Sequence, residues 1–363
     1  MTQRSTVTPG SAVSPGEFDV LVAGMVFADV VFTDLPTPPA PGTEVWAAGM
    51  GTSPGGIANL AVALSRLGLR TGLITGFGDD GYGQWCRQVL TDQEGIDTSM
   101  SPSFDGWHTP VTVSMAYDGD RAMVTHGHES PVPPSRLLTP GSTARAVIAE
   151  LDGDPWWQQL RASGALVFAD VGWDGTGAWD PCVLDRLSGC HCFMPNDREA
   201  MAYTRTRTPE EALELLGDRV PLAVVTLGAQ GAIALDSGSG TWARVPALPV
   251  RAIDPTGAGD CFGAALVAGT LAGWPLDVRL KFATLTAGLA VQQFAGALAT
   301  PGWGDVADWW TEQVRAAASG DPVAMRLRDE YSFLPDLIPA GTPARVRRAE
   351  ATIAKFAHLP GRP

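Results

Sequence analysis

The segment Asp254-Pro-Thr-Gly-Ala-Gly-Asp260 places three small residues and a carboxylate directly before an apolar, small-residue run that predicts a helix. Small residues leave backbone N–H groups unshielded. A Gly-rich turn at a helix N-terminus binds anions because these groups and the positive end of the helix dipole point at one place. A carboxylate is unfavourable in a simple phosphate site, but it is suitable if Asp260 takes a proton from a hydroxyl that attacks the phosphate. The alternative interpretation is an Asp that only caps the helix.

A second segment, Gly55-Gly56-Ile-Ala-Asn59, stands at the start of a helical pattern. Two glycines let the backbone approach a ligand closely. The amide of Asn59 can both donate and accept hydrogen bonds, which suits a vicinal diol. The residues alone support a helix N-terminus without a ligand equally well.

Two shorter patterns lie further along the chain. Asn196 and Glu199 are three residues apart, so a helix would place both side chains on one face of its first turn. A capping box has the same spacing and needs no ligand. The pattern Thr226-Leu-Gly228-Ala-Gln-Gly231 is a Gly-rich turn after a predicted strand, and alone it is a weak signal.

Together with Gly76-Phe-Gly78-Asp79-Asp80-Gly81, these segments resemble the signatures of the PfkB (ribokinase-like) carbohydrate kinases, in the family's order over about residues 18–305. The resemblance implies an α/β fold, namely a doubly wound, mostly parallel sheet flanked by helices, with a small β-sheet lid. It implies transfer of the γ-phosphoryl group of ATP to a sugar hydroxyl with Mg²⁺, and it leaves open a monovalent cation such as K⁺.

The same resemblance implies a role for each matched residue. Asp260 is the general base, and the N–H groups of Gly257, Ala258 and Gly259 hold the charge on the transferred group. The residues implied to bind the sugar are Asp29, Gly55, Gly56 and Asn59. Those implied to bind the nucleotide are Asn196, Thr226, Gly228, Gly231 and Thr284, and Glu199 orders Mg²⁺ through water.

One departure concerns the acceptor. Ribokinases often carry a polar residue two positions before Asp29, where this chain has Phe27. This favours an acceptor with an apolar face or a larger group over ribose. A nucleoside kinase of the same superfamily stays open, because Phe27, Trp107, His126 and His128 would suit base stacking as well as sugar packing. Ordinary lid or core packing explains these four residues more simply.

Other function classes lack their motifs. No G-x-G-x-x-G follows the first predicted strand, and no G-x-x-x-x-G-K-[ST] occurs, which argues against a Rossmann dehydrogenase and a P-loop kinase. A catalytically silent sugar-binding regulator also stays open, although the intact Asp260 and its neighbouring small residues argue against it.

The predicted elements indicate a parallel α/β sheet. Apolar strands alternate with helical patterns. The strands are expected at 18–24, 71–77, 165–170, 192–196 and 222–228, and helices at 57–67, 82–94 and 282–294. Short strands at 30–33 and 43–48 and a hairpin pattern at 109–125 fit such a sheet poorly. We expect segments 30–52 and 108–127 to form a lid over the acceptor, and lid-to-lid packing to make a homodimer.

Composition limits the partners. A net charge of −14 argues against nucleic acid and anionic membranes. Five irregularly spaced cysteines favour a reducing cytoplasm, and the absence of an 18-residue apolar run argues against a membrane span. We expect a disordered tail at 1–17, a kinase domain at 18–318 and a helical extension at 319–363.

Overall fold

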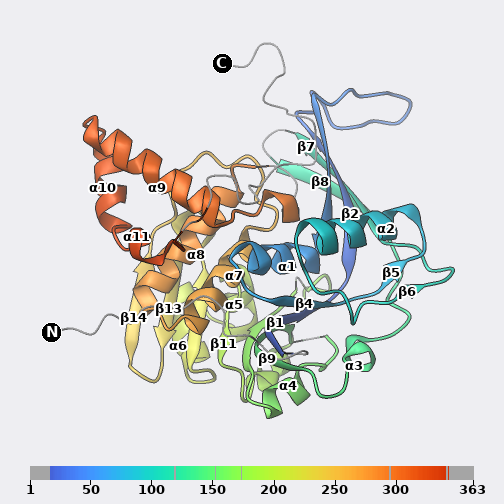
Figure 1. Cartoon of the computed structure of the whole chain (residues 1–363), viewed down its shortest axis with the longest axis horizontal. Coiled ribbons are helices and arrows are strands. Elements are labelled where there is room, and N and C mark those ends of the chain that lie inside the picture. Colours follow the sequence, from blue (N-terminus) through green and yellow to red (C-terminus); the bar gives the residue numbers. More distant parts are fainter. Residues whose placement is uncertain are drawn as a thin grey trace.

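The computed structural model describes residues 17–342, except 118, 119, 152, 173, 294, 295 and 341. The predicted N-terminal tail, apart from residue 17, and the last part of the predicted extension lie outside these residues. Figure 1 shows a large central sheet between helices and a smaller sheet at the upper right.

The large sheet contains eight strands. They are β1 Glu17–Ala23, β4 Thr71–Ile74, β9 Thr143–Glu150, β10 Leu166–Asp170, β11 Cys192–Phe193, β12 Leu222–Thr226, β13 Ala232–Asp236 and β14 Thr241–Val245. Their spatial order is β14-β13-β12-β11-β10-β9-β1-β4, parallel from β12 to β4 and antiparallel at the β13–β14 edge. The predicted mostly parallel sheet is therefore confirmed. Strand β9 is absent from the sequence-based prediction, because its three alanines are weak strand formers.

Helices cover both faces of this sheet. They are α1 Ile57–Arg66, α2 Gly81–Gln88, α3 Pro134–Leu137, α4 Gln158–Ala162, α5 Asp197–Thr204, α6 Pro209–Gly217, α7 Ala258–Leu271, α8 Leu276–Ala290, α9 Trp303–Ala318, α10 Pro322–Glu330 and α11 Leu334–Leu337. Strand β1 shows why both faces need cover. Val20 and Val22 pack in the core with α1, α7 and α8, whereas Leu21 packs in a second core with α4 and α6. None of the described helices is long and apolar enough to cross a membrane.

A separate four-stranded sheet lies beside the large one (Figure 1). Its strands are β2 Val26–Thr33, β3 Gly49–Gly56, β7 Val111–Tyr117 and β8 Asp120–His126, in the order β3-β2-β7-β8. Only the β2–β7 pair is parallel. A two-stranded pair, β5 Phe77–Gly78 and β6 Ser103–Phe104, is also present. The expected small β-sheet is therefore confirmed, and we call β2, β3, β7 and β8 the lid sheet.

The predicted strand at 43–48 is wrong. The structure has no strand there, and Trp46 is 80% exposed. The strand that pairs with β2 is β3, from the Thr33–Gly49 pair to the Val26–Gly56 pair. Its Gly-rich sequence has little strand propensity, and Pro54 is tolerated because β3 is an edge strand.

The described part of the C-terminal extension contains two helices. Helices α10 and α11 follow α9 and lie at the left of Figure 1. Leu327, Tyr331 and Leu334 are buried in the main core. This segment therefore packs on the large sheet's own helices.

Candidate active site

Helix α7 places Asp260 in its first turn. Gly257 is the N-cap with φ 76°, a left-handed conformation that favours glycine. The first N–H groups of a helix have no partner within it. The Ala258 N–H donates to the Pro255 carbonyl at 3.2 Å, whereas no bond is found for the Gly257 and Gly259 N–H groups among the described residues. Two of the three predicted anion-binding donors are thus free to meet a ligand.

Asn59 connects two distant parts of the chain at this point. Its Nδ2 donates to Asp260 Oδ2 at 3.0 Å, although the residues are 201 positions apart. Its Oδ1 is buried and has no hydrogen-bond partner within the described part of the chain. An unpartnered buried acceptor costs free energy unless a ligand hydroxyl or water donates to it. Asn59 therefore holds the carboxylate and offers an acceptor to a ligand.

The carboxylate of Asp260 is electrostatically suited to act as a base. Burial raises its pKa to about 6, the Asn59 hydrogen bond opposes this shift, and the charge of Glu150 adds to it. A carboxylate that is largely ionised at neutral pH, yet more basic than a solvated one, accepts a proton more readily.

Asp29 lies against the backbone of β3. A Cβ atom added to Gly55 would lie 1.9 Å from Asp29 Oδ2, so only glycine leaves room for this carboxylate. Burial raises the pKa of Asp29 to about 7; the charge of Asp254 adds to the shift, and Arg121 and a Thr112 hydrogen bond oppose it. Gly56 has φ 62°, and its Cα faces the Phe27 ring. The structure thus brings the predicted residues Asp29, Gly55 and Gly56 together.

Asp29 lines a pocket of ≈ 730 Å³ between the lid sheet and α2. The lining residues are Ala28, Asp29, Val30, Thr52, Asp80, Gly81, Tyr82, Trp85, His108, Thr109 and Val111. Asp80 fixes one wall, because its carboxylate accepts from the N–H and Oγ1 of Thr109 at 2.7 and 3.0 Å. Phe27 is not in this lining, and its ring lies near Gly56. Tyr82 and Trp85 supply the aromatic surface instead.

Arg121 connects the lid sheet to the loop before α7. Its Nη1 lies 3.3 Å from Asp254 Oδ1, and the same oxygen accepts from the N–H and Oγ1 of Thr256 at 2.9 and 2.6 Å. This contact places β8 beside the predicted anion site. Sequence reasoning missed Arg121, because nothing near position 121 indicates a partner 133 residues away.

Asn196 and Glu199 form a capping box at the start of α5. The Glu199 N–H donates to Asn196 Oδ1 at 3.0 Å, and the Asn196 N–H donates to Glu199 Oε2 at 3.0 Å. The capping box, which is the interpretation of this spacing without a ligand, is therefore present. It does not remove a role toward a metal, since Glu199 is buried and burial raises its pKa.

The Gly-rich turn after β12 lies next to that motif. Thr226 and Asn196 form an isolated parallel β-bridge, and the Thr226 N–H donates to the Pro195 carbonyl at 3.1 Å. A Cβ at Gly231 would lie 2.0 Å from the Val245 carbonyl oxygen, and Gly228 and Gly231 have φ 54° and 94°. Thr284 is 5% exposed on α8, and its Oγ1 has no partner among the described residues.

Sequence reasoning missed Asp170, the last residue of β10. Burial raises its pKa well above the ordinary value, and the charges of Glu199, Asp260 and Glu150 raise it further. The charges of these three carboxylates, which come from different elements, thus act on Asp170 at the carboxyl edge of the sheet. The sequence could have indicated Asp170. It ends strand β10, Asn196 follows strand β11, and the carboxyl ends of neighbouring parallel strands lie at the same edge of the sheet.

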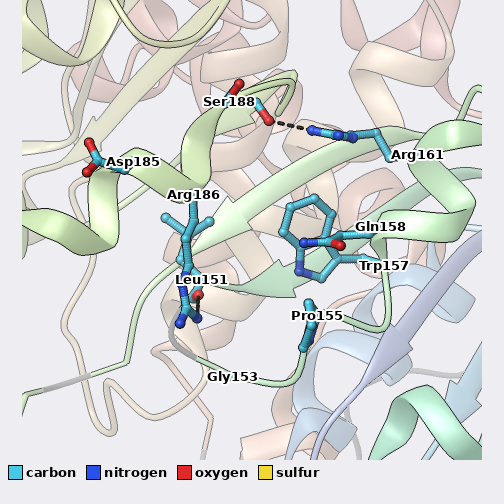
Figure 2. A pocket seen from close by; sticks show the side chains of 9 residues that line it. All are labelled: Leu151, Gly153, Pro155, Trp157, Gln158, Arg161, Asp185, Arg186 and Ser188. Atoms are coloured by element: carbon cyan, nitrogen blue, oxygen red, sulfur yellow. Dashed lines mark hydrogen bonds between the residues drawn. The ribbon is translucent and has the colours of Figure 1, made fainter.

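A second hollow, of ≈ 410 Å³, lies beside α4 (Figure 2). Arg161 donates to the Ser188 carbonyl and Arg186 to the Leu151 carbonyl across it. None of the predicted site residues lines this hollow. The candidate active site is therefore the region between the lid sheet and the carboxyl edge of the large sheet.

Comparisons with known proteins agree with the fold. Residues 19–135 and 153–302 match the family described as pfkB family carbohydrate kinase. Fructoselysine 6-kinase of Shigella flexneri is 30% identical over 63% of this chain and 84% of its own length. A nucleoside kinase of Methanothermobacter thermautotrophicus is 27% identical over 81% and 96%. An E. coli protein provisionally identified as ribokinase II, solved in complex with ATP and Mg²⁺, has a TM-score of 0.68 and 20% identity, covering 78% of this chain and 96% of that one.

Proposed function

The chain belongs to the pfkB family of carbohydrate kinases, and we propose that it transfers the γ-phosphoryl group of ATP to a hydroxyl of a sugar or sugar-like acceptor. The observation that carries this proposal is the Asn59–Asp260 hydrogen bond. It joins the residue implied to bind the acceptor to the residue implied to activate it. A single hydroxyl can therefore meet both side chains.

Asp260 acts as the base in this proposal. The acceptor hydroxyl gives its proton to the Asp260 carboxylate while its oxygen forms the new bond to phosphorus, and the bond from phosphorus to the leaving oxygen breaks. The Gly257 and Gly259 N–H groups, with Ala258, stabilise the charge on the transferred group. Asn59 keeps the carboxylate oriented. Asp29 accepts a hydrogen bond from another hydroxyl of the acceptor.

The residues of the site fit ATP with Mg²⁺. Asp170 and Glu199 carry the carboxylate oxygens that Mg²⁺ prefers, and a divalent cation held near them through water would offset the repulsion that Glu199, Asp260 and Glu150 exert on Asp170. When bound, Mg²⁺ neutralises the charge of the phosphates. Asn196 pairs with Thr226, and Gly228 and Gly231 lie in the turn that follows. We assign these four residues and Thr284 to the nucleotide, and Glu199 to the metal through water. Glu199→Gln should raise the Mg²⁺ concentration needed for half-maximal rate.

A nucleoside is the second candidate acceptor. Tyr82, Trp85 and His108 line the Asp29 pocket, and aromatic walls suit a base as well as the apolar face of a larger sugar derivative. The related nucleoside kinase covers more of this chain than the fructoselysine kinase does. A sugar or sugar-like acceptor stays first because the family matched is that of the carbohydrate kinases.

The lid sheet closes over the acceptor in this proposal, which excludes the water that would otherwise compete for the phosphoryl group. Apolar side chains remain exposed on it, among them Met50, Met123 and Val124. Lid-to-lid packing in a homodimer would cover them. Sedimentation of the protein tests the dimer, and a monomeric mass would remove it without affecting the kinase.

The deciding experiment is a coupled ADP-release assay with ATP and Mg²⁺ over monosaccharides, sugar acids, sugar–amine adducts and nucleosides. Turnover of at least one sugar-type compound is expected. Turnover of nucleosides alone would replace the first candidate by the second. No turnover of any acceptor by folded protein that binds ATP would contradict the proposed activity.

A further inference from the structure

Three of the five histidines of this chain meet at one corner of the lid sheet. His126 ends β8 and pairs with Val111 at the start of β7, and His108 precedes β7. The ring centroids are 4.9 Å apart for His108 and His126, 5.0 Å for His108 and His128, and 5.4 Å for His126 and His128. We call these three residues the lid histidines.

Contacts between the two segments that carry the lid histidines hold these residues together. Trp107 Nε1 donates to the Glu129 carbonyl at 3.2 Å, just outside the cluster, and the Thr112 and Thr125 hydroxyls lie 3.1 Å apart on its other side. A Cβ at Gly127 would lie 2.6 Å from Pro110 Cβ, so the glycine lets the segment between His126 and His128 approach the segment after His108. The convergence thus has a structural cause in two paired segments.

The spacing of the nitrogen atoms suits a transition metal. One ring nitrogen from each lid histidine lies within 4.8 Å of the others. Three imidazoles bound tetrahedrally at about 2.0–2.1 Å have nitrogens roughly 3.4 Å apart, a distance reached by small side-chain rotations. His126 and His128 are exposed, so their rings have room to turn. Imidazole favours Zn²⁺, Cu²⁺ or Ni²⁺, whereas Mg²⁺ takes oxygen ligands.

We propose that His108, His126 and His128 bind one Zn²⁺ ion, at a site separate from the carboxylates assigned to Mg²⁺. Three protein ligands leave a fourth tetrahedral position for water or another donor. His108 also lines the Asp29 pocket, so the ion would lie at the edge of the acceptor site. The ion would join the segment before β7 to the end of β8 and so stiffen this corner of the lid sheet.

Metal binding is measured on the full chain, produced without a histidine tag and stripped with a chelator. Zn²⁺ is titrated against a chromophoric chelator, and Co²⁺ is added to separate samples to record its visible absorption. One equivalent of Zn²⁺ and a tetrahedral Co²⁺ spectrum are expected. His126→Ala and His128→Ala should each weaken Zn²⁺ binding at least about tenfold, since loss of even an outer partner of a ligand typically costs 10–100-fold.

Two matched controls keep the result specific. His191→Gln removes an imidazole beside β11, away from the lid histidines, and Met123→Ala truncates an exposed side chain of β8. Both should bind Zn²⁺ like the unmodified protein. Absence of stoichiometric binding, or full binding by the His126→Ala/His128→Ala double variant with its fold intact by circular dichroism, would overturn the site. Because no substrate is present, this outcome is independent of whether the chain is a sugar kinase.

Discussion

The two partly buried carboxylates that we assign to the acceptor site, Asp260 and Asp29, are held in different ways. Asp260 stands in the first turn of α7 on the large sheet, and a side chain from α1 fixes it. Asp29 stands on β2 of the lid sheet, against the backbone of Gly55, and its main charged neighbours are Asp254 and Arg121. Burial raises the pKa of both, to about 6 and about 7. In the proposed mechanism the large sheet therefore carries the base, and the lid sheet carries the group that binds the acceptor.

The largest effect is expected from Asp260→Asn. The amide cannot take the hydroxyl proton, so kcat should fall at least roughly 10²-fold with KM for both substrates nearly unchanged. In the unmodified enzyme kcat should also fall as the pH drops through about 6, because the base becomes protonated. Steady-state kinetics from pH 5 to 8 measure both. Near-full activity of the variant would show that Asp260 is not the base.

Asp29→Asn tests the lid half of the comparison. Loss of a hydrogen bond to a charged group costs about 1.5–3 kcal/mol, so the acceptor KM should rise roughly 10–100-fold while the ATP KM stays constant. Gly55→Ala should also raise the acceptor KM. The added Cβ would lie 1.9 Å from Asp29 Oδ2, so the carboxylate would have to move away. Gly175→Ala is the control, since nothing lies within 4 Å of its added Cβ. A rise in the ATP KM alone would reverse the assignment of the two sides.

Asp260→Asn should also stabilise the protein at neutral pH. The folded state raises the pKa of Asp260 from 3.8 to about 6, so it binds the proton more tightly than the unfolded state does. The stability from this group is therefore lost as pH rises between these values. At pH 7 the free energy of unfolding of the variant should exceed that of the unmodified protein by at most about 3 kcal/mol, since each pKa unit corresponds to about 1.4 kcal/mol. At pH 4 the two proteins should differ little. Denaturant unfolding without ATP or Mg²⁺ measures this; equal stability at pH 7 would contradict it.

The smallest effect is expected from Arg121→Gln, which breaks the contact between the lid sheet and the loop before α7. The Arg121 side chain is 30% exposed, and partly exposed ion pairs contribute about 0.2–1 kcal/mol. The acceptor KM should change at most about fivefold, with kcat preserved. Arg244→Gln, which breaks a surface pair with Glu210, should change neither constant. A 10²-fold loss of kcat for Arg121→Gln would instead place this side chain at the reacting atoms.

Sequence reasoning succeeded where short segments carry their own conformational demand. Gly257 adopts a left-handed conformation and starts α7, so the position of Asp260 follows from seven consecutive residues. Asn196 and Glu199 likewise make their contacts within one helical turn. Continuous apolar strands also indicated the parallel sheet, since both faces of that sheet are buried.

It failed where a contact depends on which strands pair. Strand β3 contains four glycines and a proline, and only its pairing with β2 makes it a strand. The sequence near Arg121 does not predict its approach to Asp254, and no motif indicates that His108, His126 and His128 meet.

The sequence by itself thus determined the family, the parallel α/β sheet and the residues at the start of α1, α5 and α7, because capping and glycine conformations are local properties. Tertiary structure alone decided the 3.0 Å contact between Asn59 and Asp260, the effect of three other carboxylates on the pKa of Asp170, and the raised pKa values of the site. These depend on burial and on distances between strands and helices far apart in the chain, which no local pattern encodes.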